Sequence, residues 1–105
     1  MLKLSLIIPV YNEERHIKPC LDAVATQSVK PDEVIIVDNN CTDKTIEIAE
    51  KYPFVTVIKE SKQGRGHART AGFNAATGDI LGRIDADSRV HKNWAEETKK
   101  CFESD

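Results

Sequence analysis

Four short aliphatic segments recur along the chain and predict the strands of a sheet. They are 4–10 (LSLIIPV), 34–37 (VIIV), 54–58 (FVTVI) and 80–84 (ILGRI). The first two are apolar at almost every position, as parallel strands become when both of their faces are covered. Pro9 is expected to close the first strand, because proline donates no hydrogen bond to a neighbouring strand.

Between and after these segments, apolar residues return at helical spacing, which predicts four helices. The first places Ile17, Leu21 and Val24 on one face, with Pro19 in its first turn, where no amide partner is lost. The second is expected to be capped by Thr42 or Asp43, to turn Ile46, Ala49 and Tyr52 inward, and to stop at Pro53. The third spans 67–77 and ends at Gly78. The fourth presents Trp94, Thr98, Cys101 and Phe102 on one face.

This alternation predicts one α/β domain over residues 1–105, with a Rossmann-like parallel sheet of about four strands flanked by helices. With right-handed crossovers, the expected strand order is 3-2-1-4. Ligands of such sheets bind beyond the carboxyl ends of the strands, near the point where the order reverses. That point lies between the first and fourth strands.

Polar residues follow three of the predicted strands at that edge of the sheet. They are Tyr11-Asn12-Glu13, Asp38-Asn39-Asn40 and Asp85-Ala86-Asp87. Residues i and i+2 of an extended segment face the same way, so Asp85 and Asp87 would present two oxygen ligands side by side. Such a pair suits Mg²⁺ or Mn²⁺ carrying a diphosphate. Taken alone, the pair equally fits an acidic turn in which Asp87 or Ser88 caps the next helix.

Composition narrows the possible functions. A net charge of −2 with mixed signs argues against a dedicated nucleic-acid binder. No apolar run is long enough to cross a bilayer, and the short apolar start is followed by no cleavage site of a signal peptide. Cys20, Cys41 and Cys101 match no zinc spacing or disulfide framework and are expected to be small buried apolar groups. We therefore expect a reduced, cytoplasmic setting, the cytoplasmic face of a membrane included.

Four motifs occur in order over nearly the whole chain: 9–14 (PVYNEE), 37–43 (VDNNCTD), 64–69 (GRGHAR) and 85–87 (DAD). Together they resemble the successive motifs of family 2 glycosyltransferases of the GT-A fold. The resemblance implies transfer of a sugar from a nucleotide diphosphate sugar to an acceptor hydroxyl, with inversion and with a divalent metal. The implied donor is a UDP-sugar.

The resemblance also implies a role for individual residues. Pro9, Tyr11 and Glu13 would line the nucleoside pocket, and Asp38 would accept a hydrogen bond from the base. Arg69 would lie near the donor. Asp87 would ligate the metal directly, and Asp85 would approach the ribose or the metal through water. Competing interpretations are that Tyr11 belongs to the core, that Asp38 only shapes its turn, and that Arg69 is a surface or ion-pairing residue.

Other classes of protein fit less well. A dinucleotide-binding oxidoreductase needs a Gly-x-Gly-x-x-Gly turn after its first strand, where this chain has 9–13 (PVYNE). His16, His67 and His91 match no metal spacing and are expected at the surface. The main alternative to an active transferase is a catalytically silent nucleotide-binding or interaction module derived from one.

The region after Asp87 carries two further expectations. In the family the catalytic base normally lies well beyond the Asp-x-Asp motif, so we expect the base and the acceptor-binding half to be missing from a chain that stops at Asp105. The fourth strand would then lie at the edge of the sheet, with apolar side chains beside unpaired backbone groups. Such an edge can pair with another chain, which predicts a homodimer joined through this strand or the final helix.

Overall fold

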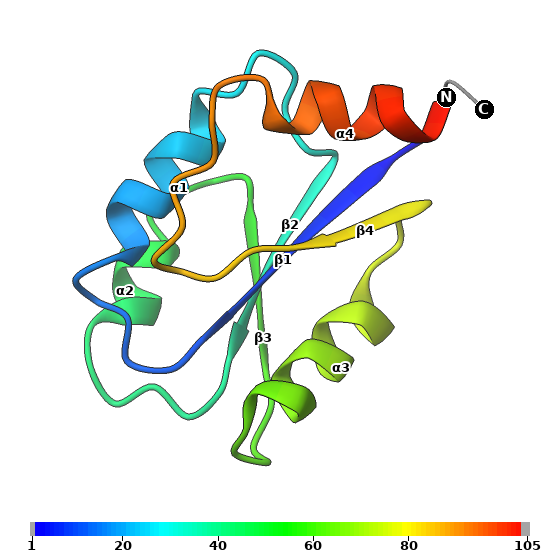
Figure 1. The fold of residues 1–105 in the computed structure, drawn as a ribbon. Helices are drawn as coiled ribbons and strands as arrows, with labels where there is room; N and C mark the ends of the chain where they lie inside the picture. Colours follow the sequence, from blue (N-terminus) through cyan, green and yellow to red (C-terminus); the bar gives the residue numbers. More distant parts are fainter. Residues whose placement is uncertain (1, 104–105) are drawn as a thin grey trace.

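The described part of the chain forms one parallel sheet. A computed structural model describes residues 2–103. Its four strands are β1 (Leu4–Val10), β2 (Glu33–Asp38), β3 (Val55–Lys59) and β4 (Ile80–Arg83), in the order β3-β2-β1-β4 (Figure 1). Ile7 of β1 lies opposite Ile35 of β2 and Arg83 of β4. The predicted fold class and strand order are therefore confirmed.

Four helices cover the two faces of this sheet. They are α1 (Ile17–Ala25), α2 (Thr45–Ala49), α3 (Arg65–Ala75) and α4 (Trp94–Glu103). Figure 1 shows α1, α2 and α4 on one side of the sheet and α3 on the other. Within residues 2–103, no helix is both long enough and apolar enough to span a membrane.

Alternating residues of the strands build the two halves of the core. Leu6 and Ile8 point toward α1 and are fully buried, whereas Ile7 between them packs with Ala68 of α3. Burying an aliphatic side chain of this kind stabilises a fold by about 1.5–3 kcal/mol. Because both faces of β1 and β2 are buried in this way, the nearly continuous aliphatic runs of the sequence are explained.

The first two helices follow the prediction closely at their cores and less closely at their ends. In α1, Pro19 sits in the first turn and Ile17 is buried, as expected. Helix α2 begins only after Lys44, so neither Thr42 nor Asp43 is its N-cap. Asp43 nevertheless accepts a hydrogen bond from the Thr45 amide at 3.0 Å and fixes the turn that leads into the helix.

The last two helices correct the prediction. Helix α3 starts at Arg65 and ends at Ala75, so Gly78 does not end it. Gly78 instead passes β1 so closely that a Cβ atom there would lie 2.5 Å from Ser5 Oγ. In α4 the buried residue is Ala95, while Cys101 and Phe102 are exposed. The expected inward face is therefore wrong at its C-terminal end, and only Cys20 of the cysteines is fully buried.

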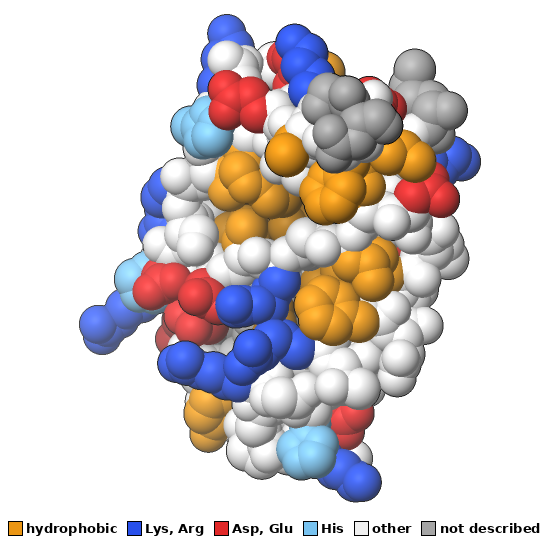
Figure 2. All heavy atoms as spheres, turned by 45° about the vertical axis from the view of Figure 1, so that its right-hand side comes forward, with side chains coloured by type: hydrophobic (Ala, Val, Ile, Leu, Met, Phe, Trp, Pro, Cys, Tyr) orange, Lys and Arg blue, Asp and Glu red, His pale blue; other side chains and the backbone are white. Residues whose placement is uncertain are grey.

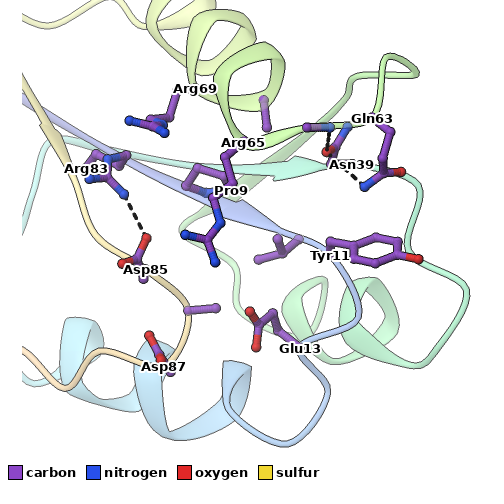
Figure 3. Close-up of a pocket in the computed structure, with 14 residues that line it drawn as sticks. Pro9, Tyr11, Glu13, Asn39, Gln63, Arg65, Arg69, Arg83, Asp85 and Asp87 are labelled. Atoms are coloured by element: carbon purple, nitrogen blue, oxygen red, sulfur yellow. Dashed lines mark hydrogen bonds and ion pairs between the residues drawn. The ribbon is translucent and has the colours of Figure 1, made fainter.

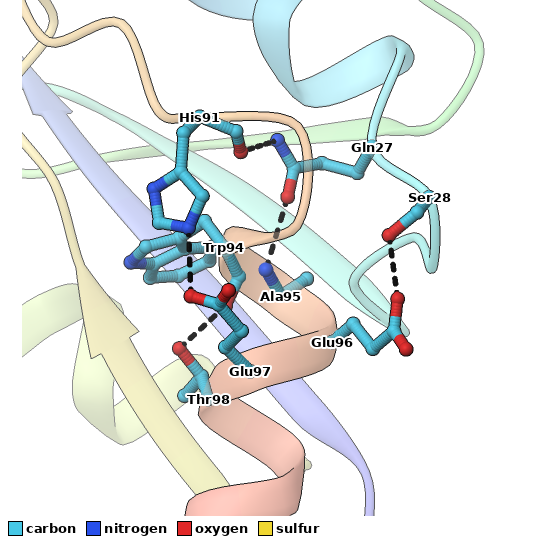
Figure 4. A network of polar contacts seen from close by, with 8 residues as sticks. All are labelled: Gln27, Ser28, His91, Trp94, Ala95, Glu96, Glu97 and Thr98. Carbon is cyan, nitrogen blue, oxygen red and sulfur yellow. Dashed lines mark hydrogen bonds and ion pairs between the residues drawn. The ribbon is translucent and has the colours of Figure 1, made fainter.

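A buried glutamine explains how α4 is oriented. Gln27, just after α1, donates to the carbonyl of His91 at 2.7 Å and accepts from the amide of Ala95 at 2.9 Å. Nearby, Ser28 donates to Glu96, and His91 contacts Glu97 (Figure 4). These contacts fix the start of α4 and the segment that precedes it, and thereby the direction in which the chain leaves the acidic motif.

Candidate functional site

A cleft lies at the carboxyl ends of the strands, between the β1 and β4 ends where the strand order reverses. Its walls come from the β1 end and following loop, the residue after β2, the start of α3, and β4 with its following loop (Figure 3). The lining residues are Pro9, Val10, Tyr11, Glu13, Asn39, Gln63, Gly64, Arg65, Ala68, Arg69, Arg83, Asp85, Ala86 and Asp87.

Most of the residues singled out in the sequence meet in this cleft. Six of them line it: Pro9, Tyr11, Glu13, Arg69, Asp85 and Asp87. Tyr11 is 53% exposed, so the interpretation that it belongs to the core is wrong. The three histidines are all exposed, as expected.

Asp38 differs from the other predicted site residues because it does not line the cleft. It is 9% exposed, and its Oδ1 accepts the Cys41 amide at 2.8 Å. Asp38 thus shapes the turn after β2, which was the competing interpretation of this residue. One carboxylate oxygen is committed to that turn.

The loops after β1 and β2 are tied to one another by side chains. Asn12 has a left-handed backbone (φ 52°), and its Oδ1 accepts the Thr42 amide at 2.8 Å. The amide of Glu13 donates to Thr45 Oγ1 at 2.8 Å. Burial raises the pKa of the Cys41 thiol to about 11, so this side chain is a neutral thiol at physiological pH. The position of Glu13 in the cleft is therefore set by the contact between the two loops and by Thr45 at the start of α2.

Asn39 organises the opposite wall; the sequence placed it at the ligand-binding edge of the sheet but gave it no role. Its side chain donates to the carbonyls of Glu60 and Lys62, at 2.9 and 2.8 Å, and its Oδ1 accepts the Gly64 amide at 3.0 Å. Gly64, at φ 135°, then leads directly into α3. The only signal in the sequence was that Asn39 directly follows the residue that ends the second strand.

Charges of both signs face one another across the cleft. Glu13, Asp85 and Asp87 supply three carboxylates, and Arg65, Arg69 and Arg83 supply three guanidinium groups. Nη1 of Arg83 lies 2.7 Å from Oδ1 of Asp85, whereas Arg65 and Arg69 form no ion pair within residues 2–103 (Figure 3). Among the described residues, the competing interpretation that Arg69 forms an ion pair is therefore wrong. No role in the site was predicted from the sequence for Arg65 or Arg83. The signal for Arg83 was its place two residues before Asp85 in an extended segment, where both side chains face the same way.

The two aspartates of the loop after β4 both line the cleft. Strand β4 ends at Arg83, and beyond it Asp85 and Asp87 are both exposed, while Ala86 between them is 1% exposed. The two carboxylates therefore lie on the cleft side of this loop. No group of three metal-ligating side chains occurs in residues 2–103. A cation held here would need further oxygen ligands from phosphate or water, which is how Mg²⁺ is commonly bound with nucleotides.

A parallel sheet of this order, with a polar cleft at its switch point, defines the chain as an α/β domain of the nucleotide-binding type. The chain belongs to glycosyl transferase family 2, whose sequence profile matches residues 5–105. Glycosyltransferase AglE of Haloferax volcanii is 38% identical over 100 residues, which are 89% of this chain and 33% of AglE.

Solved structures show the same GT-A fold. The structure of Staphylococcus aureus TarS 1–349 in complex with UDP has a TM-score of 0.90 and 29% identity, and the match covers 98% of this chain and 32% of that one. The mannosyltransferase PcManGT of Pyrobaculum calidifontis, in complex with GDP-Man and Mn²⁺, has a TM-score of 0.74 and 34% identity over 82% of this chain and 28% of that one. The chain thus spans about a third of the length of these relatives.

Proposed function

We propose that this chain binds the donor of a glycosyl transfer, a UDP-sugar, in the cleft between the β1 and β4 ends. The observation that carries the proposal is the convergence of six residues, from three motifs of the family, on one cleft. The relatives support the ligand class, because TarS has been solved with UDP and with UDP-GlcNAc. The start of α3 also lines the cleft, and the amino end of a helix favours a phosphate group.

In this proposal, Asp87 holds a Mg²⁺ or Mn²⁺ ion directly and Asp85 lies beside it. When bound, the cation neutralises the charge that develops on the leaving diphosphate. Arg65 and Arg69, which form no ion pair within the described residues, face the same diphosphate from α3. Pro9 and Tyr11 provide the surface against which the nucleoside packs. The complex of PcManGT with GDP-Man and Mn²⁺ supports a metal in this role.

The transfer itself is proposed for the whole protein. An acceptor hydroxyl attacks the anomeric carbon from the face opposite the diphosphate, with inversion, and a carboxylate base takes its proton. We assign that base to none of the residues 2–103, because the carboxylates of the cleft are those placed at the donor. A transfer assay with a panel of sugar nucleotides separates this function from that of a silent binding module, since both bind the nucleotide and only the transferase consumes it.

The binding proposal is tested by calorimetric titration of UDP with Mn²⁺ and with EDTA. We expect tighter binding with Mn²⁺, and we expect Asp87→Ala to abolish the difference. Glu47→Ala is the matched control, because Glu47 is an exposed carboxylate on α2 that lies outside the cleft. Equal affinity for UDP in both conditions contradicts the metal role, and no binding of any sugar nucleotide contradicts the function.

The second proposal is that Asp38 recognises the base. The variant that tests it must leave intact the turn after β2, which Asp38 also holds. Asp38→Asn keeps an oxygen that can accept the Cys41 amide, while it replaces the other oxygen by an amide group. If Asp38 accepts a hydrogen bond from the base, this variant should weaken UDP binding by about 1–3 kcal/mol. Unchanged affinity with unchanged stability would show that Asp38 serves the turn alone.

A further inference from the structure

The ion pair between Arg83 and Asp85 conflicts with the use of Asp85 at a cation site. Arg83 is the last residue of β4, and Nη1 of Arg83 lies 2.7 Å from Oδ1 of Asp85. A guanidinium group therefore pairs with a carboxylate that lines the cleft at the proposed cation site. A pair this exposed, with side chains 35% and 64% exposed, contributes little to the stability of the fold. Stability of the fold is thus a poor explanation for it.

The backbone on the two sides of the pair is held differently. Arg83 is fixed in the sheet opposite Ile7 of β1, and the amide of Ile84 still bonds to the Ile7 carbonyl at 3.1 Å. Asp85 lies beyond that last bond, in the turn closed by the Ser88 amide on the Asp85 carbonyl. The guanidinium can therefore change partners by side-chain rotation from a fixed Cα, without any movement of the strand.

A nucleotide diphosphate bound in this cleft supplies the alternative partner. Arg65 and Arg69 stand on the α3 wall of the cleft, and Arg83 stands on the β4 wall. A diphosphate between these walls would meet guanidinium groups from both sides, in the fork geometry that suits phosphate oxygens. Within the described residues, Arg83 is the one of the three that must first leave a carboxylate.

We infer that Arg83 is a positioning residue that exchanges partners when the donor binds. In the ligand-free protein it holds Asp85. When the cation and the nucleotide diphosphate enter, Asp85 turns to the cation and Arg83 to a phosphate oxygen. This inference rests on the proposed function and adds that the cation and the nucleotide favour each other's binding through one arginine.

The exchange predicts effects of opposite sign on the two ligands when Arg83 is changed to Met. Binding of Mn²⁺ alone, measured by the electron paramagnetic resonance signal of the free ion, should tighten about twofold to fivefold, because Asp85 is released from its partner. Binding of UDP at saturating Mn²⁺, measured by calorimetry, should weaken about tenfold or more, because a charge-assisted bond to phosphate is lost. Arg83→Lys should recover part of the UDP affinity, because it keeps the charge without the fork.

Arg15→Met is the matched control, because Arg15 is an exposed arginine of the loop after β1 that lies outside the cleft. It should leave both affinities within about twofold, since it removes the same charge without a contact in the site. If Arg83→Met weakens both ligands, Arg83 only orients Asp85, and if it changes neither, the pair is a surface contact; both results overturn the exchange. If the parent protein binds no sugar nucleotide, the proposed function fails and the exchange fails with it.

Discussion

Replacing Asn39 by Ala tests how the wall of the cleft is held. The Asn39 side chain is buried, with 3% of the residue exposed, and bonds to three backbone groups of the segment between β3 and α3. It also accepts a weaker bond from the Gln63 side chain at 3.3 Å. The segment it holds contains Gln63 and Gly64 and leads into Arg65, and all three residues line the cleft. Removing the amide should therefore affect both stability and ligand affinity.

The magnitude follows from the partners that are left without a bond. Three backbone bonds at a net of about 0.5–1.5 kcal/mol each amount to about 1.5–4.5 kcal/mol. The segment lies at the surface, where water can bond to some of the backbone groups that lose their partner. We therefore expect the lower half of that range, about 2 kcal/mol. Because Arg65 follows this segment directly, UDP affinity should fall as well.

Urea denaturation followed by circular dichroism measures the first effect, and calorimetry measures the second. Asn39→Asp should be at least as destabilising, because a second oxygen would then face the carbonyls of Glu60 and Lys62. Asn40→Gly is the control: Asn40 is exposed, bonds to the same segment and has φ 71°, which glycine adopts without strain. A loss below about 0.5 kcal/mol for Asn39→Ala, or an equal loss for Asn40→Gly, would refute the reasoning.

Three further predictions concern the fold. Gly72→Ala should destabilise by about 1–3 kcal/mol in urea denaturation, because its Cβ would lie 2.4 Å from Ile7 Cγ2 where α3 meets the sheet; an unchanged midpoint would contradict this close packing. Although partial burial opposes it, the Lys99 ammonium at 2.7 Å and the Leu4 amide hold the pKa of Asp32 below its usual range. The stability that Asp32 contributes is then fully present above about pH 4 and is lost as the pH falls through the lowered pKa. Lys99→Met should therefore reduce the loss of stability at acid pH, and an unchanged loss argues against the ion pair between Lys99 and Asp32. Light scattering across a dilution series should show self-association through β4, which among the described residues pairs only with β1 and leaves Leu81 44% exposed; a monomer at high concentration contradicts it.

The hydrophobic face that Figure 2 brings forward bears on the last of these predictions. It shows hydrophobic side chains gathered on the β4 side of the molecule, next to a mixed group of basic and acidic side chains. Trp94 of α4 covers Gly82, since a Cβ at Gly82 would lie 3.3 Å from the indole ring. This contact shields one face of the edge strand and leaves the outer backbone groups of β4 for a partner.

The strands could be predicted because they depend on short apolar runs. Their order could be predicted because it depends on a rule that holds for parallel sheets in general. Runs such as residues 34–37 are apolar at every position, which is typical of a strand covered on both faces. Right-handed crossovers then leave few orders for four parallel strands. The carboxyl ends follow from the order, which is why the sequence predicts that Glu13, Asp85 and Asp87 lie together.

What could not be predicted depends on contacts between distant segments. Asn39 joins the cleft wall through residues more than twenty positions later in the chain, and no periodicity in the sequence reports such a bond. Gln27 and the pair between Lys99 and Asp32 hold α4 with Ala95 inward, whereas Phe102, seven residues later and therefore on the same side of the helix, is 58% exposed. Apolar spacing alone identifies this side of the helix but does not show how far along the helix it is covered.

The balance of charge in the cleft explains why donor and cation would bind together. Three carboxylates come from the loops after β1 and β4, and three guanidinium groups come from α3 and the end of β4. A cation alone must enter beside arginines, and a diphosphate alone must enter beside carboxylates, so each meets like charges as well as opposite ones. When both are present, the positive charge of the cation offsets the repulsion between the diphosphate and the carboxylates. The negative charge of the diphosphate likewise offsets the repulsion between the cation and the arginines. The strand ends and the α3 wall therefore suit a metal-bridged nucleotide better than either of its components.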